Sequence, residues 1–420
     1  MPEEFKQYGY LIGRIRRGTP RDKRLVAKHV GNVYGTKTAP KIWFDCLTNI
    51  LQSLGWRTSK QDPCVFYKYV SDVVNILLVY VDDIILLSNP VPRDALYEKL
   101  RGHFNFKEED NLMNYLGMSF VCNKEGIEVS HKRYIGHMVE NFGLANCVPE
   151  KTPAAVSVKL EKIVGSNPTE ETPYRSIVGS VMHTARYCRP DIIHSVQVLS
   201  RRLQNPTKAD LKAAKHVLRY LKGTIDIGIQ LRWIRKGKWF IITAYCDASH
   251  GDVVNGRSSY GYYIFLNGCL ISWKATASRL SNLSSAESEL VAATEATKTV
   301  KWVQDFLASL DLPVRRPSTL YIDNQSTLAM LKTNQISHAN RHITVRLGFV
   351  RDCVNDGTIC PKHIPTDDNL ADLTTKNLAP AQFKRLRDFV FNPWTCPTIL
   401  NDIDSVTVEE AAEEEQIEDI

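Results

Sequence analysis

The chain lacks several features that would place it in a class at once. Its ten cysteines include no C-x-x-C pair, which argues against a zinc ribbon or a disulfide scaffold and for reduced thiols, mostly in the core. No internal repeat recurs at a fixed period. No stretch reaches the roughly 20 apolar residues of a membrane helix, and no basic segment followed by an apolar one opens the chain as a secretory leader would. We therefore expect a globular protein of a reducing compartment with no membrane partner.

Charge is unevenly spread along the chain. The 420 residues carry a net charge of +7, but residues 402–420 contain nine Asp or Glu and no Lys or Arg, which leaves +16 on the rest. This excess favours a polyanionic partner, and nucleic acid is the leading candidate. Many soluble proteins are basic without binding nucleic acid, so charge alone leaves both interpretations open. The acidic tail itself is predicted to be disordered.

Two adjacent carboxylates interrupt the most apolar run of the chain, VVNILLVYVDDIILLS at 73–88. Asp82 and Asp83 would be costly to bury there unless they pair or hold a metal ion. Since strands rarely exceed ten residues and Asp favours turns, we predict two fully buried strands that meet at a tip carrying both carboxylates. The pair resembles half of a site for Mg²⁺, which prefers oxygen ligands.

The segment TKADLKAAKHVLRYLKG predicts a helix with two different faces. It opens on a capping box of Thr207 and Asp210 and closes at Gly223. Five cations share one side of it: Lys208, Lys212, Lys215, Arg219 and Lys222. A solvated lysine face is one interpretation. Because like charges at these spacings repel, contact with nucleic-acid phosphates is at least as good an interpretation in a basic protein.

From residue 239 onward, short β-rich runs alternate with helical ones, which predicts an α/β domain. Four acidic residues stand at the ends of its predicted elements: Asp247, Glu289, Asp323 and Asp372. Glu287 is left out, because Ser284 three residues earlier predicts a capping box. Alanines that follow Glu289 would let its helix approach the sheet closely.

Four converging carboxylates would repel one another and raise each other's pKa values unless cations neutralised them. A centre with two Mg²⁺ ions does so, one ion generating hydroxide and the other stabilising the leaving oxygen in phosphodiester hydrolysis. Any one of the four could be a surface acid. The ordered set, however, indicates a metal-dependent site.

The chain resembles the C-terminal part of copia-type retrotransposon Pol polyproteins. YVDD, NVYGTKTAPKIWFD, DPCVFYK, YLGMSF, YRSIVGSVMHTARYCRPDI and NPTKADLKAAKHVLRYLKGT resemble blocks of the reverse transcriptase. CDAS, SSAESEL, YIDNQS and NLADLTTK resemble blocks of RNase H, and the agreement is collinear over residues 1–380. The resemblance implies an α/β (α+β) fold: a partial palm at 1–120, a largely helical thumb and connection at 121–236, an RNase H-like five-stranded mixed sheet with helices at 237–380, and the acidic tail at 381–420.

The resemblance also assigns roles to residues. Asp82 and Asp83 correspond to metal-binding polymerase aspartates. Asp247, Glu289, Asp323 and Asp372 correspond to the metal-binding carboxylates of RNase H, and each active site would hold two Mg²⁺ or Mn²⁺ ions. Lys37 lies in a segment that seats template and nucleotide, although Thr36 and Thr38 depart from the family pattern. His342, in ANRHITVR, matches a recurring position that is structural or substrate-facing.

One polymerase carboxylate of the family lies upstream of the segment that MPEEF resembles, so we expect this chain to lack it and not to synthesise DNA alone. The expected activity is hydrolysis of RNA in RNA/DNA hybrids by an RNA-directed DNA polymerase family member. Expected partners are the hybrid, RNA template and DNA, a second copy of the chain, and dNTPs only if the missing part is supplied. The expected location is the cytoplasmic retroelement particle or the nucleus. The alternative is an inactive element remnant that binds nucleic acid without cleaving it.

Overall fold

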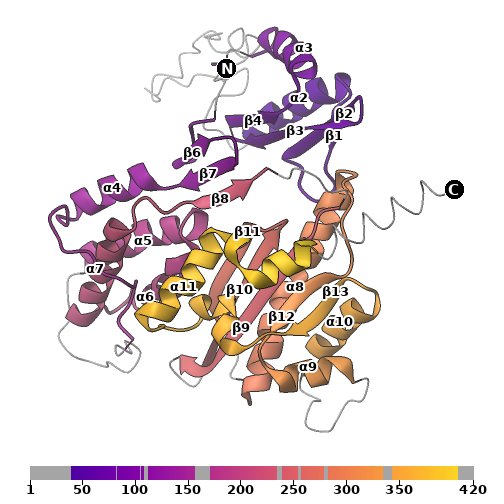
Figure 1. The fold of residues 1–420 in the computed structure, drawn as a ribbon. Helices are drawn as coiled ribbons and strands as arrows, with labels where there is room; N and C mark the ends of the chain where they lie inside the picture. The colour runs from indigo at the N-terminus through magenta and orange to yellow at the C-terminus, as the bar shows by residue number, and fades with distance from the viewer. Residues whose placement is uncertain are drawn as a thin grey trace, which may run out of the picture. The chain divides into compact units, whose positions relative to one another are not determined.

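The computed structural model describes residues 39–81, 83–104, 106–107, 112–156, 171–233, 239–253, 257–278, 282–333 and 343–404. The chain divides into two compact units, which are drawn together in Figure 1. One comprises residues up to 111 with 305–311, and the other comprises 112–304 and 312 onward. The first unit therefore ends close to the predicted palm boundary at residue 120, whereas the predicted boundary at 236/237 falls inside the second unit.

In residues 39–111, the described part of the first unit consists of a four-stranded antiparallel sheet and two helices. The sheet has the order β1-β2-β3-β4, with the bounds Arg57–Thr58, Val65–Val70, Val73–Tyr80 and Asp83–Leu87. The helices are α2 (Ala39–Ser53) and α3 (Pro90–Arg101). Leu51, Phe66 and Leu77 are completely buried in the core between them.

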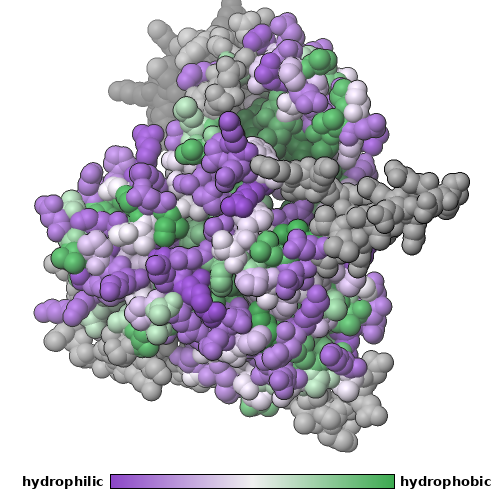
Figure 2. Space-filling model, in the orientation of Figure 1, coloured by the Kyte–Doolittle hydropathy of each residue, from purple (hydrophilic) through white to green (hydrophobic). Residues whose placement is uncertain are grey.

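The predicted hairpin of residues 73–88 forms, but its strands are not fully buried. β3 and β4 pair with Tyr80 opposite Asp83. β3 alternates buried with accessible residues, and every residue of β4 is at least partly exposed. Figure 2 shows hydrophobic residues at the surface in the place where Figure 1 labels β3 and β4. Because the Asp83 side chain is exposed, its carboxylate stays hydrated and its place beside an apolar run is not costly. Asp82 lies outside the described residues.

The described residues between 112 and 233 form a four-stranded antiparallel sheet and four α-helices of the second unit. The sheet has the order β5-β6-β7-β8, with the bounds Asn114–Tyr115, Met118–Cys122, Gly126–Ser130 and Ile229–Arg232. The helices are α4 (Lys132–Asn141), α5 (Glu171–Tyr187), α6 (Ile193–Ser200) and α7 (Lys208–Gly223). Both bonds of the predicted capping box between Thr207 and Asp210 are present at the start of α7. The helix predicted from TKADLKAAKHVLRYLKG is confirmed.

A five-stranded mixed sheet forms the rest of this unit, as predicted. Its order is β11-β10-β9-β12-β13, with the bounds Cys269–Ala277, Arg257–Leu266, Ile242–Val253, Ser318–Ile322 and Ile359–His363. The first three strands are antiparallel neighbours, and β12 runs parallel to both β9 and β13. The associated helices are α8 (Ser285–Ser309), α9 (Gln325–Lys332), α10 (Thr344–Asn355), η6 (Leu370–Thr374) and α11 (Pro380–Phe391).

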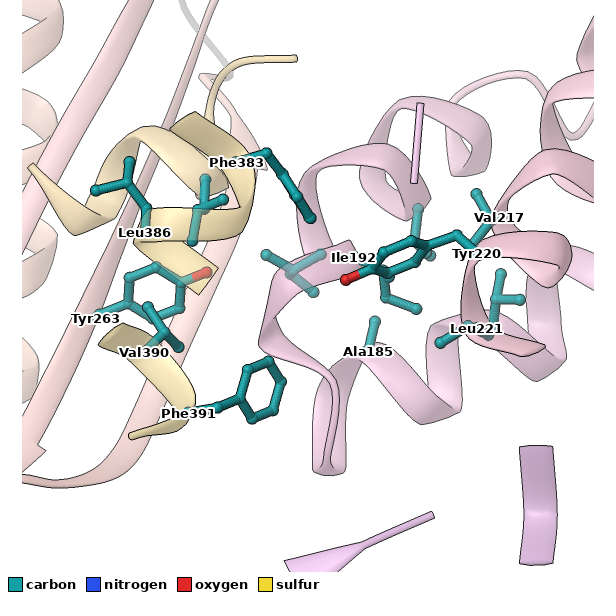
Figure 3. Close-up of a cluster of buried hydrophobic side chains, with 14 of the residues drawn as sticks. Ala185, Ile192, Val217, Tyr220, Leu221, Tyr263, Phe383, Leu386, Val390 and Phe391 are labelled. Carbon is teal, nitrogen blue, oxygen red and sulfur yellow. The ribbon is translucent and has the colours of Figure 1, made fainter. Parts of the chain in front are cut away.

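One hydrophobic core joins the middle helices to the five-stranded sheet. Figure 3 shows Tyr220 of α7 and Ile192 facing Phe383 of α11, with Tyr263 of β10 drawn beside Val390 of α11. All four side chains belong to one cluster of buried residues. The predicted boundary at 236/237 therefore does not separate two hydrophobic cores, because residues on both sides of it belong to one core.

The prediction of a disordered tail at 381–420 is wrong for its first residues. α11 buries Phe383, Leu386 and Val390 in the core. Farther on, the Asp402 carboxylate is 6% exposed and accepts a hydrogen bond of 3.0 Å from the Thr243 hydroxyl of β9. The chain is thus folded to residue 404, and residues 405–420 lie outside the described part.

The structure places no disulfide bond among the ten cysteines. Only four of them are buried, so the prediction that most of the thiols lie in the core is wrong. Among the described residues, none of the helices combines the length and the apolar character that a bilayer crossing requires.

Candidate metal centre

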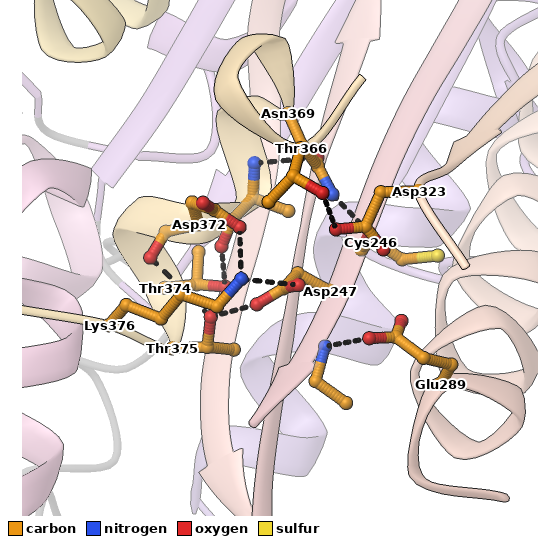
Figure 4. Close-up of polar contacts among 12 residues, drawn as sticks. Cys246, Asp247, Glu289, Asp323, Thr366, Asn369, Asp372, Thr374, Thr375 and Lys376 are labelled. Atoms are coloured by element: carbon orange, nitrogen blue, oxygen red, sulfur yellow. Dashed lines mark hydrogen bonds and ion pairs between the residues drawn. The ribbon is translucent and has the colours of Figure 1, made fainter. Parts of the chain in front are cut away.

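Two neighbouring parallel strands bring Asp247 and Asp323 together. β9 and β12 pair with Tyr245 opposite Tyr321. Two residues farther along, Asp247 still belongs to β9, while Asp323 directly follows the end of β12. Because side chains alternate between the faces of a strand, both carboxylates extend from the same face, as Figure 4 shows. Contrary to the prediction, β9 does not end near Asp247 but continues to Val253.

Helix α8 supplies the third carboxylate, that of Glu289. Ala292, Ala293 and Ala296 are completely buried, so small side chains let the helix lie close to the sheet as expected. One carboxylate oxygen each of Asp247, Glu289 and Asp323 lie within 4.8 Å of one another. Among the described residues, this is the one group of three acidic, His or Cys side chains that could share a metal ion.

The two oxygens of Glu289 have different surroundings. Oε1 accepts a hydrogen bond of 3.2 Å from the backbone N–H of Ala248. Oε2 is buried and has no hydrogen-bond partner in the described part of the chain. A buried carboxylate oxygen without a donor is costly unless a cation neutralises it. Since hard oxygen ligands suit Mg²⁺ and Mn²⁺, the three carboxylates fit a divalent cation of that class.

Asp372 reaches the centre through Lys376 rather than directly. Lys376 Nζ lies 2.7 Å from Asp372 Oδ1 and 3.1 Å from Asp247 Oδ1. Both carboxylates are almost completely buried, whereas the lysine side chain is 32% exposed. Three of the four predicted carboxylates could therefore share an ion. The fourth, that of Asp372, is linked to Asp247 by the ammonium group of Lys376 (Figure 4).

The concentration of negative charge shifts the pKa values of these groups. Burial, and then Asp247 and Asp323, raise the pKa of Glu289 well above its ordinary value. Burial and then Asp247 raise the pKa of Asp323, and the same two causes raise the pKa of Asp372 to about 7. Burial alone would lower the pKa of Lys376, but Asp247 and Asp372 raise it. The centre therefore favours an added positive charge.

Residues that hold these carboxylates in place were missed by sequence reasoning. The Thr375 hydroxyl donates to Asp247 Oδ2, and the Thr366 hydroxyl donates to Asp323 Oδ2 at 3.1 Å. The Asn369 side-chain amide donates to the Cys246 carbonyl at 3.0 Å and so ties η6 to β9. The available signal is the polar segment around Asp372, in which Lys376 follows by four residues, a spacing at which side chains meet on a helical turn.

The cationic side of α7 is partly engaged within its own unit. Arg219 pairs with Glu150 at 2.8 Å, and Lys222 Nζ donates to the Cys147 carbonyl at 2.7 Å. Three exposed lysines remain on this side: Lys208, Lys212 and Lys215. With Arg219 they line a surface groove of about 340 Å³. Lys37 and His342, the other predicted nucleic-acid contacts, lie outside the described residues.

The predicted polymerase site stays incomplete in the described part of the chain. Asp83 is exposed at the start of β4 and belongs to no group of three side chains there that could share an ion. Since Asp82 is not described, the metal role of the pair stays a prediction.

Comparisons with known proteins place the chain among retroelements. Residues 18–156 match the family described as reverse transcriptase (RNA-dependent DNA polymerase). The retrovirus-related Pol polyprotein from transposon TNT 1-94 of Nicotiana tabacum is 33% identical over 382 residues, which are 88% of this chain and 28% of that polyprotein. A putative transposon Ty5-1 protein of Saccharomyces cerevisiae is 30% identical over 270 residues, which are 63% of this chain and 86% of that protein.

Among solved structures, the chain is similar to the foamy viral protease-reverse transcriptase in complex with RNA/DNA hybrid. The identity is 13%, the TM-score is 0.42, and the match covers 84% of this chain and 40% of that one. The chain spans about a quarter of the length of the first curated relatives that it matches. With 30% identity over most of the Ty5-1 protein, the chain belongs to the family of copia-type retrotransposon Pol polyproteins and carries the reverse transcriptase region of that family.

Proposed function

We propose that the chain hydrolyses RNA in RNA/DNA hybrids at the centre of Asp247, Glu289 and Asp323, as an RNase H does. The observation that supports this proposal best is the convergence of three ligand oxygens within 4.8 Å of one another. The buried Glu289 Oε2, which has no donor among the described residues, adds to it because that atom calls for a cation.

Each residue of the centre has a distinct task in this proposal. Asp247, Glu289 and Asp323 would hold divalent ions. When bound, a pair of such ions activates water and stabilises the charge that develops on the phosphate. Thr375 fixes the orientation of Asp247, and Thr366 fixes that of Asp323. Asp323 is the least buried of the three acids, so the side of the centre at Asp323 is the side open to substrate.

The exposed lysines of α7 are the proposed contacts to the nucleic-acid backbone. Lys208, Lys212 and Lys215 have no ion-pair partner in the described part of the chain and line one groove. Ammonium groups spaced along a helix can each meet a phosphate. The proposed partner is an RNA/DNA hybrid, and the proposed location is the retroelement particle in the cytoplasm.

A cleavage assay tests the proposal. The full chain is incubated with Mg²⁺ and a hybrid labelled on its RNA strand, and the RNA fragments are measured. Asp247→Asn and Glu289→Gln should each reduce the rate by at least about a hundredfold, because losing a residue that only hydrogen-bonds to a metal ligand already costs 10- to 100-fold. Glu287→Gln is the matched control. It makes the same chemical change on the same helix, and Gln can replace Glu in a capping box.

The assay also addresses the alternative of an inactive remnant. A wild-type chain that leaves the hybrid intact with both Mg²⁺ and Mn²⁺, yet binds it in a salt-sensitive way, would replace the proposed activity with binding alone. Cleavage that neither Asp247→Asn nor Glu289→Gln reduces would assign the activity to another site or to a contaminant.

A further inference from the structure

We propose that Lys376 is a built-in counter-cation of the carboxylate centre, which neutralises Asp247 and Asp372 and competes with divalent ions for them. This inference rests on the proposed function and specifies what sets the affinity of that site for metal. In this role Lys376 is a positioning residue and not a catalytic one.

The geometry places the ammonium group between two acids that come from different elements. Asp247 lies within β9, and Asp372 lies on η6. Lys376 Nζ contacts one oxygen of each, at 3.1 Å and 2.7 Å. The side chains of the two acids are 1% and 2% exposed, and that of Lys376 is 32% exposed. The lysine therefore covers the solvent side of two buried carboxylates, where an incoming cation would replace it.

Negative charges outnumber positive ones around Lys376. Four carboxylates surround the centre, and Lys376 is the ammonium group that contacts two of them. A divalent ion bound to Asp247 would share this carboxylate with Lys376, and two cations only a few ångströms apart repel strongly at a partly buried site. Because lysine has a long flexible stem, its ammonium group can move away when the ion binds. Lys376 thus stabilises the centre without metal and weakens its affinity for metal.

A purely structural role for Lys376 predicts the opposite sign. If the lysine only held Asp372 in place, removing it would disorder the centre and weaken metal binding. The affinity of a variant without the ammonium group therefore separates the two roles, independently of any cleavage activity.

Calorimetric titration of the full chain with Mg²⁺ measures that affinity. Lys376→Met should bind Mg²⁺ about tenfold more tightly than wild type and should unfold at a lower temperature in EDTA. Lys376→Arg keeps the charge and should bind no more tightly than wild type. Lys298→Met is the matched control. It removes the same charge from a lysine that pairs with Glu295 on the exposed side of α8. Its Mg²⁺ affinity should equal that of wild type.

The outcomes separate this inference from the proposed function. If Asp247→Asn leaves Mg²⁺ binding unchanged, the proposed metal centre itself is wrong. If Asp247→Asn abolishes binding while Lys376→Met binds equally or more weakly than wild type, only the role of Lys376 is overturned. Should Lys376→Met not fold, Lys376→Gln removes the charge but keeps a hydrogen-bond donor, and the same comparison applies to it.

Discussion

A β-carbon built on Gly261 would lie 2.2 Å from the hydroxyl oxygen of Thr374. Gly261 of β10 is the pairing partner of Asp247 in β9, and Thr374 is the last residue of η6. The absent side chain therefore lets η6 rest on the sheet directly beside Asp247. This close approach brings Asp372 and Lys376 to the carboxylate centre.

Gly261→Ala should destabilise the chain and damage the centre. The new methyl group would also meet the Lys274 carbonyl at 2.4 Å, and backbone of a paired strand cannot move aside easily. Overpacking of this kind costs roughly 1–3 kcal/mol. We expect a lower free energy of unfolding in urea. We also expect an Mg²⁺ affinity, measured by calorimetry, that differs from wild type, because displacing η6 moves both Thr375, which holds Asp247, and Lys376, which competes with the ion.

The control for this substitution is Gly179→Ala on an accessible turn of α5. Nothing lies within 4 Å of a β-carbon there. Replacing a helical glycine with alanine should stabilise the chain by up to about 1 kcal/mol and leave Mg²⁺ binding unchanged. Wild-type Mg²⁺ affinity in Gly261→Ala would contradict the role assigned to the close approach.

Local patterns predicted much of this fold, and long-range packing explains what they missed. Apolar periodicity identified the strands and helices that carry Asp247, Glu289 and Asp323, because each element has a buried face. The contact of Lys376 with Asp247 joins residues 129 positions apart, and no local pattern encodes it. Gly261 did carry a signal, since an isolated glycine inside a strand often marks a close approach.

Two predictions were wrong because they relied on the overall composition of a segment. The acidic count of residues 402–420 suggested a disordered tail, yet Asp402 is one of those acids and is buried against the sheet. In the same way, the apolar letters around Asp83 suggested full burial, although β4 is accessible along its whole length. In both cases the neighbours in space, and not those in sequence, decide whether a carboxylate is hydrated.

The His131 side chain should make the stability of the chain sensitive to acid. Its ring is completely buried, has no hydrogen-bond partner among the described residues, and stacks on His183 with 5.1 Å between ring centroids. Burial and then the charge of His183 lower the pKa of His131 to about 4. The unfolded chain therefore takes up this proton first, so stability present above pH 6.5 is lost as the pH falls toward 4.

His131→Phe tests that linkage and keeps a stacked ring. The difference in free energy of unfolding between wild type and variant should change by on the order of 1–3 kcal/mol between pH 7 and pH 4, at the expense of wild type. Acids with raised pKa values make the chain more stable as the pH falls, which is the opposite effect. Their contributions are the same in both proteins and cancel in the difference. The matched control is His137→Phe, an exposed residue of helix α4, which begins directly after His131. Equal pH profiles for His131→Phe and wild type would refute the prediction.

The carboxylate of Asp402 should anchor the end of the described chain to the five-stranded sheet. It accepts hydrogen bonds from Thr243 of β9 and from Thr319 and Tyr321 of β12, and it pairs with Lys362 of β13 at 3.2 Å. Asp402→Ala would leave these donors without their acceptor, at a cost of roughly 2–5 kcal/mol. Urea unfolding measures the loss. Asp404→Ala removes an exposed carboxylate two residues later and should change the stability by less than about 0.5 kcal/mol.

The exposed lysines of α7 should determine the salt dependence of nucleic-acid binding. Each phosphate contact contributes about 0.7–0.9 to the slope of log affinity against log salt concentration. The triple substitution of Lys208, Lys212 and Lys215 to Gln should therefore reduce that slope by about 2–3. Fluorescence anisotropy with a labelled RNA/DNA hybrid, between roughly 50 and 200 mM salt, measures it. Substituting three exposed lysines that are not part of α7, namely Lys99, Lys124 and Lys298, makes the same change in net charge and should alter the slope much less. Equal reductions in the two triple variants would mean that overall charge, and not this groove, attracts the hybrid.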